Sequence, residues 1–173
     1  NDFVIKSDLF KNLPLIDHIK SKLEFSKVDE NFGKKQLIEL GIPENAKYVC
    51  FFARDDKYLN STQSYTDWSY HDYRDADIEK QIPAMEELTK QGFHAVRVGS
   101  DVKKSLKCSN EKIIDYSSSN LRSEFLDLYL IENCEFFVGD TSGIRWIPIL
   151  FRKPCVVINL VGRGDAVGIT RSV

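Results

Sequence analysis

Short, mainly apolar runs alternate with segments of helical spacing along this chain, and this alternation constrains its fold more than any other feature. The runs are Tyr48–Ala53, Phe93–Val98, Phe136–Val138 and Cys155–Ile158, with a weaker one at Lys112–Tyr116. Continuous apolar runs are typical of strands that are covered on both faces of a sheet. The sequence therefore predicts a set of short, buried strands.

Helical segments lie between these strands, at Asp77–Gln91, Leu121–Asn133 and Ile144–Phe151. Strands that alternate with helices indicate a parallel sheet built from right-handed crossovers. We therefore expect residues 46–173 to form one α/β domain, a doubly wound, mostly parallel, Rossmann-like sheet with helices on both faces.

The first 45 residues favour helix instead. A stripe of apolar residues at helical spacing marks a first helix, and it consists of Leu15, Ile16, Ile19 and Leu23. A second helix is expected from about Asn31 to Leu40, because Gly41 is a natural left-handed cap. We expect residues 1–45 to form a helical N-terminal segment packed on the main domain. A chain that begins at Asn1 without a signal peptide is expected to be a piece of a longer protein.

Charge and composition exclude several kinds of partner. The 173 residues include 24 basic and 26 acidic side chains, so the net charge of −2 gives no general attraction to nucleic acid. The apolar runs are far shorter than the roughly 20 residues that span a bilayer. The four cysteines are widely spaced, with neither a CxxC pair nor a histidine at zinc spacing. We expect a cytosolic protein with reduced cysteines, no membrane span and a local site for any anion.

Polar residues follow three of the predicted strands, at the edge where open parallel sheets bind their ligands. The first strand is followed by Arg54 and Asp55, the second by Gly99 and Ser100, and the fourth by residues 139–143, Gly-Asp-Thr-Ser-Gly. Because the carboxyl ends of parallel strands share one edge, we expect these three places to converge.

The turn at 139–143 is the sharpest local signal. Its two glycines let the backbone approach a ligand closely, and the amides of Thr141, Ser142 and Gly143 would open the helix that follows. The turn thus predicts a phosphate cradle that includes Asp140. The alternative is that Asp140, Thr141 or Ser142 only caps the helix.

Arg54 ends an apolar strand, where an unpaired guanidinium would be costly. Its forked donors suit a diphosphate, which they can bind with two hydrogen bonds. The alternative is an ion pair with Asp55, Asp56 or Asp140.

The loop Asp55–Arg74 is unusually long, and loops of this length in compact domains are usually functional or mobile. It contains His71 beside Asp72, Tyr73 and Arg74, so a side chain that titrates near neutral pH could reach a ligand. The alternative is a solvated loop histidine. The following Asp75-Ala76-Asp77 resembles the metal-binding carboxylate pair of some sugar transferases, but it precedes a helix and is interpreted as a cap. No metal site is predicted.

Four stretches carry a family resemblance that covers most of the chain after residue 22. They are LEFSKVDENFGKKQLIELGIP at 23–43, YVCFFARD at 48–55, YHDYRDADIEKQIPAMEELTKQGFHAVRVGS at 70–100, and FFVGDTSGIRWIPILFRKPCVVIN at 136–159. Together they resemble a family of bacterial glycosyltransferases found with surface-polysaccharide biosynthesis. The combination of YHDYRDADI with GDTSG is the fairly specific part.

Such proteins are similar to the GT-B class, in which two Rossmann-like halves close around a nucleotide sugar and the carboxyl-terminal half holds the nucleotide. The resemblance implies metal-independent transfer of a sugar from a nucleotide-sugar donor to a hydroxyl of a glycan or lipid-linked acceptor. It implies no cofactor besides the donor, a site in the cytoplasm or peripherally at the inner membrane, and a missing amino-terminal domain of the same protein. Arg54 is also similar to the arginine that fucosyltransferases place on the diphosphate in an HxRxxD-like motif, but Phe52 stands at the histidine position.

For sugar transfer, the site must place positive potential at the departing diphosphate, and the acceptor hydroxyl needs a base. We expect Arg54 and the amides of residues 141–143 to hold the diphosphate, with Gly99 and Ser100 bordering the base or ribose. The side chains expected to close over the donor are His71, Tyr73 and Arg74, and the candidate bases are His71, Asp72 and Asp55. The alternatives are a nucleotide-sugar epimerase and a non-catalytic nucleotide-binding module.

Overall fold

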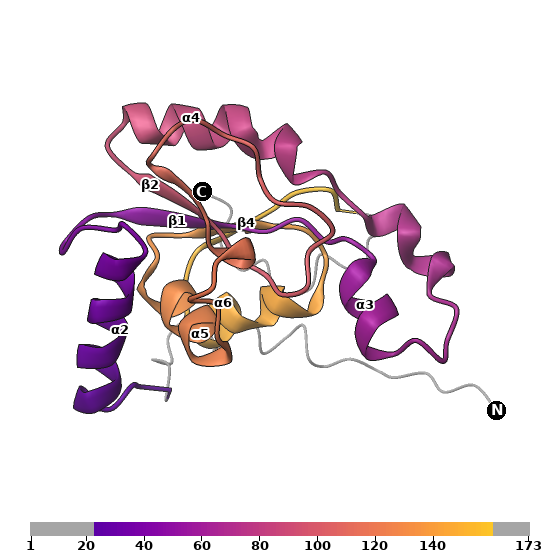
Figure 1. Ribbon diagram of the computed structural model, residues 1–173, viewed down its shortest axis with the longest axis horizontal. Coiled ribbons are helices and arrows are strands. Elements are labelled where there is room, and N and C mark those ends of the chain that lie inside the picture. Colours follow the sequence, from indigo (N-terminus) through magenta and orange to yellow (C-terminus); the bar gives the residue numbers. More distant parts are fainter. Residues whose placement is uncertain (1–22, 161–173) are drawn as a thin grey trace, which may run out of the picture.

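The computed structural model describes residues 23–160, and these form one five-stranded sheet with helices on both faces (Figure 1). The strands are β1 (Tyr48–Phe51), β2 (His94–Arg97), β3 (Ile113–Asp115), β4 (Phe137–Gly139) and β5 (Cys155–Val157). All neighbouring strands pair in parallel, in the order β3-β2-β1-β4-β5. This confirms the predicted α/β class and the parallel sheet, because it is the strand order with which doubly wound nucleotide-binding sheets begin.

The order of the strands reverses between β1 and β4. From β1 the chain runs outward through β2 to β3, and then returns to the other side of β1. Phe51, the last residue of β1, lies opposite Arg97 of β2 and Val138 of β4, so these three strands end at nearly the same level. The residues that follow them must therefore meet at the switch point, where such sheets bind ligands.

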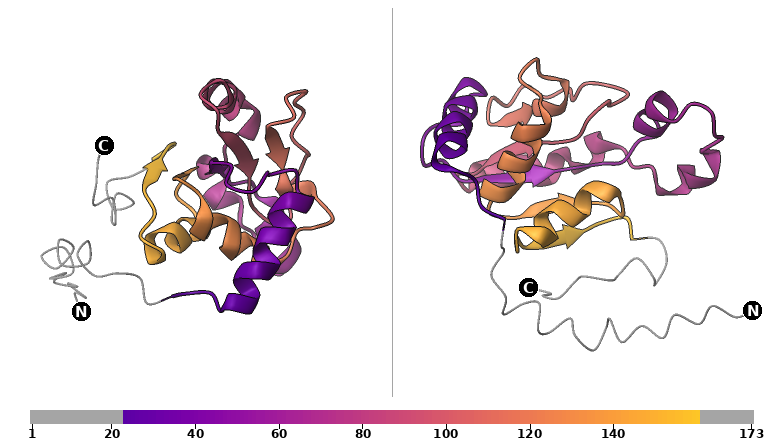
Figure 2. Two further views of the ribbon diagram at one scale, coloured as in Figure 1. Left: turned by 90° about the vertical axis from the view of Figure 1, so that its left-hand side faces the viewer. Right: turned by 90° about the horizontal axis from the view of Figure 1, so that it is seen from below.

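Helices cover the two faces of the sheet unequally (Figures 1 and 2). One face carries α4 (Ile82–Lys90), and the other carries α2 (Lys27–Glu39), α5 (Glu124–Asn133) and α6 (Trp146–Leu150). The remaining elements are α3 (Lys57–Thr62) and the 3-10 turns η2 (Ser69–Arg74), η3 (Ile78–Gln81), η4 (Tyr116–Ser118) and η5 (Gly143–Arg145). None of the helices formed by residues 23–160 combines the length and the apolar character that a membrane span needs.

Two apolar layers fill the space between the sheet and its helices. Along β1, Tyr48 and Cys50 belong to the layer under α2 and α5, whereas Val49 and Phe51 belong to the layer under α4. All four residues are buried. β1 is thus covered on both faces, as its unbroken apolar run predicted.

The predicted helix at 31–40 begins earlier, at Lys27. Ser26 caps it, since its Oγ accepts from the Asp29 amide at 3.2 Å and the Asp29 carboxylate accepts from the Ser26 amide at 3.3 Å. The helix ends as predicted, before Gly41 at φ 88°. α2 lies on α5, where a side chain at Gly33 would overlap the ring of Tyr129. The predicted first helix with Leu15, Ile16 and Ile19 lies outside the described residues.

Two other predicted helices are partly 3-10 turns. The segment predicted at 77–91 begins with η3, and Asp77 caps this turn by accepting from the Glu79 amide at 3.2 Å, as the capping interpretation expected. The segment predicted at 144–151 begins with η5, and α6 follows it for only five residues. Pro148 has no N–H for the carbonyl of Ile144, so a regular helix cannot form across this stretch.

Candidate functional site

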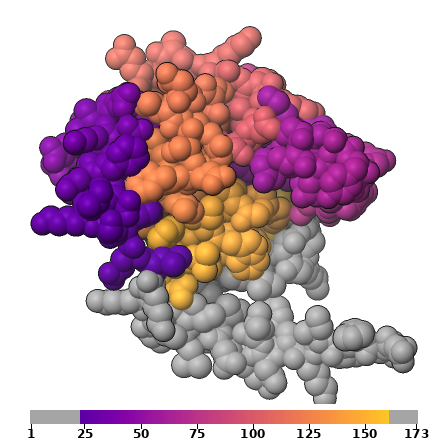
Figure 3. Space-filling model, turned by 60° about the horizontal axis from the view of Figure 1, so that its bottom comes forward, coloured from indigo at the N-terminus to yellow at the C-terminus, as the bar shows by residue number. Residues whose placement is uncertain are grey.

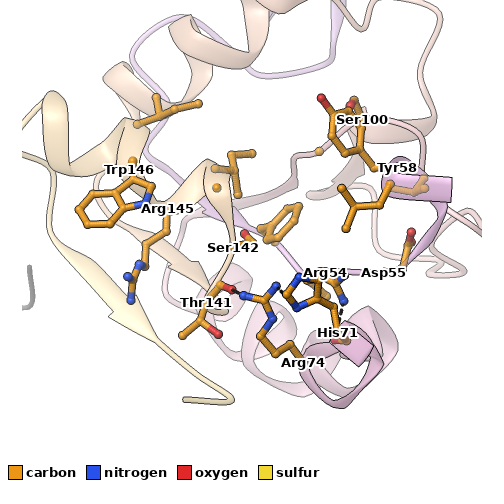
Figure 4. Close-up of a pocket in the computed structure, with 18 of the residues that line it drawn as sticks. Arg54, Asp55, Tyr58, His71, Arg74, Ser100, Thr141, Ser142, Arg145 and Trp146 are labelled. Carbon is orange, nitrogen blue, oxygen red and sulfur yellow. Dashed lines mark hydrogen bonds between the residues drawn. The ribbon is translucent and has the colours of Figure 1, made fainter. Parts of the chain in front are cut away.

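A cavity of about 690 Å³ opens where β1, β2 and β4 end (Figure 4). Residues from all three predicted strand ends line it, and they are Arg54, Asp55, Gly99, Ser100, Thr141, Ser142 and Gly143. Its remaining walls come from the α3–η2 segment and from η5–α6, which lie on either side of it (Figure 3). The predicted convergence at the sheet's edge is therefore present, at the point where the strand order reverses.

Arg54 lies in the wall of this cavity and is only 6% exposed. Its backbone N–H donates to Asp140 Oδ2 at 2.5 Å, and its Nη1 donates to the His71 carbonyl at 3.1 Å and pairs with Asp75. Its Nη2 is buried without a hydrogen-bond partner. The predicted alternative, an ion pair with Asp55, Asp56 or Asp140, is wrong about the partner, because the chain folds Asp75 of the η2 segment back onto the guanidinium. The ion pair uses one end of the fork and leaves the other for a ligand.

Asp140 lies directly behind Arg54 and is almost fully buried. Burial raises the pKa of its carboxyl to about 6, although the hydrogen bond from the Arg54 amide and the Arg54 charge act in the opposite direction. Asp140 does not line the cavity. Its role here is to tie the end of β4 to the end of β1, which holds the two sides of the switch point together.

The 3-10 turn η2 brings Arg74 and His71 to the same wall. Arg74 Nη2 lies 2.9 Å from His71 Nδ1, and its Nη1 donates to the Thr141 carbonyl at 3.4 Å, while its Nε is buried without a partner. Burial and the charges of Arg74 and Arg54 lower the pKa of His71. Because arginine only donates, neutral His71 accepts at Nδ1 and carries its proton on Nε2. It is therefore placed as a hydrogen-bond donor, and action as a base would require the bond to Arg74 to break.

The turn after β4 differs from the predicted cradle. Ser142 has no side-chain capping bond, and its amide donates to the Asp140 carbonyl at 3.0 Å, so it is not free for a ligand. Since η5 and the five-residue α6 replace a regular helix, the helix dipole there is weak. No hydrogen bond to another described residue is seen for the amides of Thr141 and Gly143. A side chain at Gly143 would meet nothing within 4 Å, so Gly143 faces open space, whereas Thr141 Oγ1 is buried without a partner.

Asp55 holds the opposite wall together. One carboxylate oxygen accepts from the Lys57 amide at 3.0 Å, and the other accepts from the Lys103 amide at 3.0 Å. The same two segments are joined by Lys57, whose Nζ donates to the Val102 carbonyl at 3.1 Å, and by the contact of Ser61 with Asp101. These bonds make α3 and the loop after β2 one cross-tied wall. Whether Asp55 also accepts a proton from a substrate stays a prediction.

Each end of the cavity carries an aromatic ring and one charged side chain, Asp55 near Tyr58 and Arg145 near Trp146. Figure 4 places Tyr58 and Ser100 toward one end and Trp146 at the other, with Arg54, His71, Arg74 and Thr141 between them. Leu59, Val102 and Gly99 add to the Tyr58 end, and Ile144 and Ile147 add to the Trp146 end. Tyr58 and Trp146 are each 48% exposed. The cavity thus has a cationic centre between two ends that each carry an exposed aromatic ring.

Besides Asp140, two predicted site residues are not brought into the cavity. Tyr73 is exposed and does not line it, and Asp72 is exposed on the outer side of η2. Asp72 instead lies in an acidic group with Asp56 and Asp75, whose oxygens are within 4.8 Å of one another. Asp75 already pairs with Arg54 and Asp56 with Lys103, so we assign no metal to this group.

Sequence reasoning missed several residues of the site. The lining residues that it did not name as site residues include Phe52, Tyr58, Trp68, Asp127, Arg145 and Trp146. Aromatic residues in the polar loop were no usable signal, because Tyr58 and Trp68 line the cavity whereas Tyr65 and Tyr70 of the same loop are exposed and do not. Asp75 as the partner of Arg54 had no signal either, since it was interpreted as part of a cap.

Comparison of the chain with protein-family models, curated proteins and solved structures found no match.

Proposed function

We propose that this chain is the donor-binding half of a glycosyltransferase, whose cavity holds the diphosphate of a nucleotide sugar. The sugar is transferred to a hydroxyl of a glycan or lipid-linked acceptor, and the protein works in the cytoplasm or peripherally at the inner membrane. The observation that carries the proposal is that two residues lining the cavity at the switch point of a parallel sheet, Arg54 and Thr141, each keep a buried polar side-chain atom, Nη2 and Oγ1, without a partner.

The cationic centre supports an anionic ligand with more than one charge. Arg54 and Arg74 lie close enough that the charge of Arg74, after burial, is the second cause of the lowered pKa of Arg54. Two like charges in a partly buried wall repel each other, and each buried donor without a partner costs about 1–3 kcal/mol. A diphosphate between them would remove the repulsion and supply acceptors for both guanidinium groups.

The shape of the cavity supports a ligand in three parts. A nucleotide sugar carries a base and a sugar on the two sides of its diphosphate, and the cavity has an aromatic ring on each side of its cationic centre. Its volume of about 690 Å³ also lies within the roughly 300–1,000 Å³ of sites for ligands of this size. A free phosphate would leave both ends empty.

The proposed chemistry follows from the same centre. When the bond between the anomeric carbon and the diphosphate breaks, the electron pair goes to the diphosphate, and the negative charge grows beside Arg54, Arg74 and the Nε2–H of His71. Donors that are in place before the reaction stabilise this charge without further reorganisation, and loss of one such donor costs about a hundredfold in rate. The acceptor hydroxyl gives its proton to a base, for which Asp55, Asp72 and His71 remain the candidates within the chain.

The test uses the whole chain and two kinds of measurement. Calorimetry with inorganic pyrophosphate and with UDP, GDP, ADP and CDP should detect binding of at least one nucleoside diphosphate, more tightly than of its nucleoside. Incubation with the matching nucleotide sugars and a lipid-linked or glycan acceptor should then release nucleoside diphosphate only when acceptor is present.

The other outcomes are equally distinct. An isomerised sugar without acceptor would indicate the epimerase, and binding of the nucleotide sugar without turnover would indicate a binding module. Absence of binding by every phosphate compound would refute the proposal.

A further inference from the structure

The two aromatic-bearing ends of the cavity differ in how they are built. At one end, Tyr58 stands on α3, which Asp55, Lys57 and Ser61 tie to the loop after β2. At the other end, Trp146 stands at the start of α6, on a short helix that follows a 3-10 turn. The first end is a cross-tied slot, and the second is an exposed rim.

The order of the strands places the two ends on opposite sides of the phosphate site. The cationic centre lies where β1 and β4 end, since Arg54 follows β1 and Thr141 follows β4. Gly99 and Ser100 follow β2, on the far side of β1 from β4. A ligand that lies across the edge therefore has one neutral group at β2 with Tyr58 and the other beyond β4 with Trp146.

The Tyr58 end has the properties of a base slot. The Tyr58 ring is half exposed and lines the cavity, and no ring contact with another described residue is seen for it. Gly99 has φ 132°, and the Phe52 ring packs against it, so that a Cβ there would lie 3.2 Å from the ring; the wall at the end of β2 is therefore closely packed. Stacking on an aromatic face is favourable for every nucleobase, because each base has a π-face. A fixed wall suits a planar group that does not react.

The Trp146 end suits the group that is transferred. The sugar has to meet an acceptor, and Trp146 lies at an exposed rim, where its indole can also pack against the C–H groups of a sugar ring. The Arg145 guanidinium lies over this ring, 5.3 Å from its centre, and gives this end of the cavity a positive charge.

On the basis of the proposed function, we infer that Tyr58 is the stacking platform for the nucleobase and that the sugar lies against Trp146. The donor thus runs from β2 across β1 and β4 toward α6. This orientation places the anomeric carbon away from Asp55. Asp55 is then a positioning residue of the base slot, and the base for the acceptor is a residue other than Asp55.

The experiment measures two affinity increments in the whole chain. The ratio of the affinities for a nucleoside diphosphate and for inorganic pyrophosphate reports the nucleoside, and the ratio for the nucleotide sugar and the nucleoside diphosphate reports the sugar. We expect Tyr58→Ala to reduce the first ratio about tenfold, as expected for one lost stacking contact, and to leave pyrophosphate affinity unchanged. Tyr58→Phe should restore it. Trp146→Ala is the matched control, equally exposed and at the other end, and should reduce only the second ratio.

The outcomes separate this inference from the function on which it rests. The orientation would be overturned if Trp146→Ala reduced the ratio of nucleoside diphosphate affinity to pyrophosphate affinity. It would also be overturned if neither variant reduced this ratio while pyrophosphate and nucleotides still bind. If the unchanged chain binds neither pyrophosphate nor any nucleoside diphosphate, the proposed function falls and the orientation falls with it. Both side chains are half exposed, so neither variant removes a part of the core.

Discussion

Replacement of Arg54 by methionine should weaken binding of a nucleoside diphosphate while the chain stays folded. Methionine keeps the apolar stem of the side chain and removes the guanidinium. Asp75 loses its partner, but its side chain is 26% exposed, so water can solvate the carboxylate. We expect a loss of stability near 1 kcal/mol.

The expected loss of affinity follows from the single free donor. Arg54 Nη2 is buried without a partner, so it can form one new charge-assisted hydrogen bond to a phosphate oxygen. Such bonds contribute about 1.5–3 kcal/mol, which corresponds to a weakening of about 10- to 150-fold in Kd. The nucleoside has no phosphate, and its affinity should change by less than about twofold, within the ±0.5 kcal/mol of an uninvolved position.

A matched control is available on the next strand. Arg97 is 2% exposed and donates from Nη1 to the Lys104 carbonyl at 2.7 Å, but it does not line the cavity. Arg97→Met therefore removes a buried guanidinium of the same kind from the same sheet and should leave diphosphate affinity unchanged.

Isothermal calorimetry of the two variants and the unchanged chain gives the affinities, and thermal unfolding by circular dichroism verifies the fold. An unchanged Kd for the diphosphate in folded Arg54→Met would remove this residue from the site. An equal loss in Arg97→Met would mean that the effect is one of stability alone, and the reasoning from Nη2 would be refuted.

Three further predictions test other parts of the structure. Gly143→Val should leave thermal stability unchanged, because a Cβ there meets nothing within 4 Å, but should weaken diphosphate binding by filling the cavity; equal affinity measured by calorimetry would favour a merely structural turn. Asp140 has a pKa raised to about 6, above the roughly 3.9 of an unfolded chain. The free energy of unfolding is therefore unaffected by this shift below about pH 4, falls by roughly 3 kcal/mol as pH rises from about 4 to about 6, and stays lower above that. Urea unfolding between pH 4 and 7 should therefore show Asp140→Asn gaining stability relative to the unchanged chain as pH rises, whereas parallel curves would contradict the raised pKa. Gly33→Ala should destabilise the chain by about 1–3 kcal/mol, because the added methyl group overlaps the Tyr129 ring and pushes α2 off α5; an unchanged urea midpoint would show that α2 is not held there.

The strands were predictable because their cause is local. Tyr48, Val49, Cys50 and Phe51 are all buried, and a strand covered on both faces leaves a continuous apolar run in the sequence. The helices were less predictable at their starts. Ser26 caps α2 before the position that the apolar spacing suggested, and Pro148 shortens α6 by removing a backbone donor.

The site was predictable only as far as chain order determines it. Arg54, Ser100 and Thr141 each lie within three residues of the end of a strand, so a parallel sheet brings them to one edge whatever the side-chain packing. Tyr73 also looked like a site residue, but the turn of η2 directs it to solvent and Arg74 to the cavity. The sequence of this segment is equally compatible with an irregular loop and with a 3-10 turn. It therefore does not show which of two neighbouring side chains points into the cavity.

The amino-acid sequence by itself determined the parallel sheet, the edge at which its polar residues gather and the presence of an arginine there, because burial and chain order act along the chain. Only the tertiary structure decided that Asp75 takes one end of Arg54, that Asp140 lies behind it and that Tyr58 and Trp146 flank the cationic centre. These pairings join residues far apart in sequence, and electrostatic and hydrogen-bonding partners are chosen by distance in space, which no local pattern records.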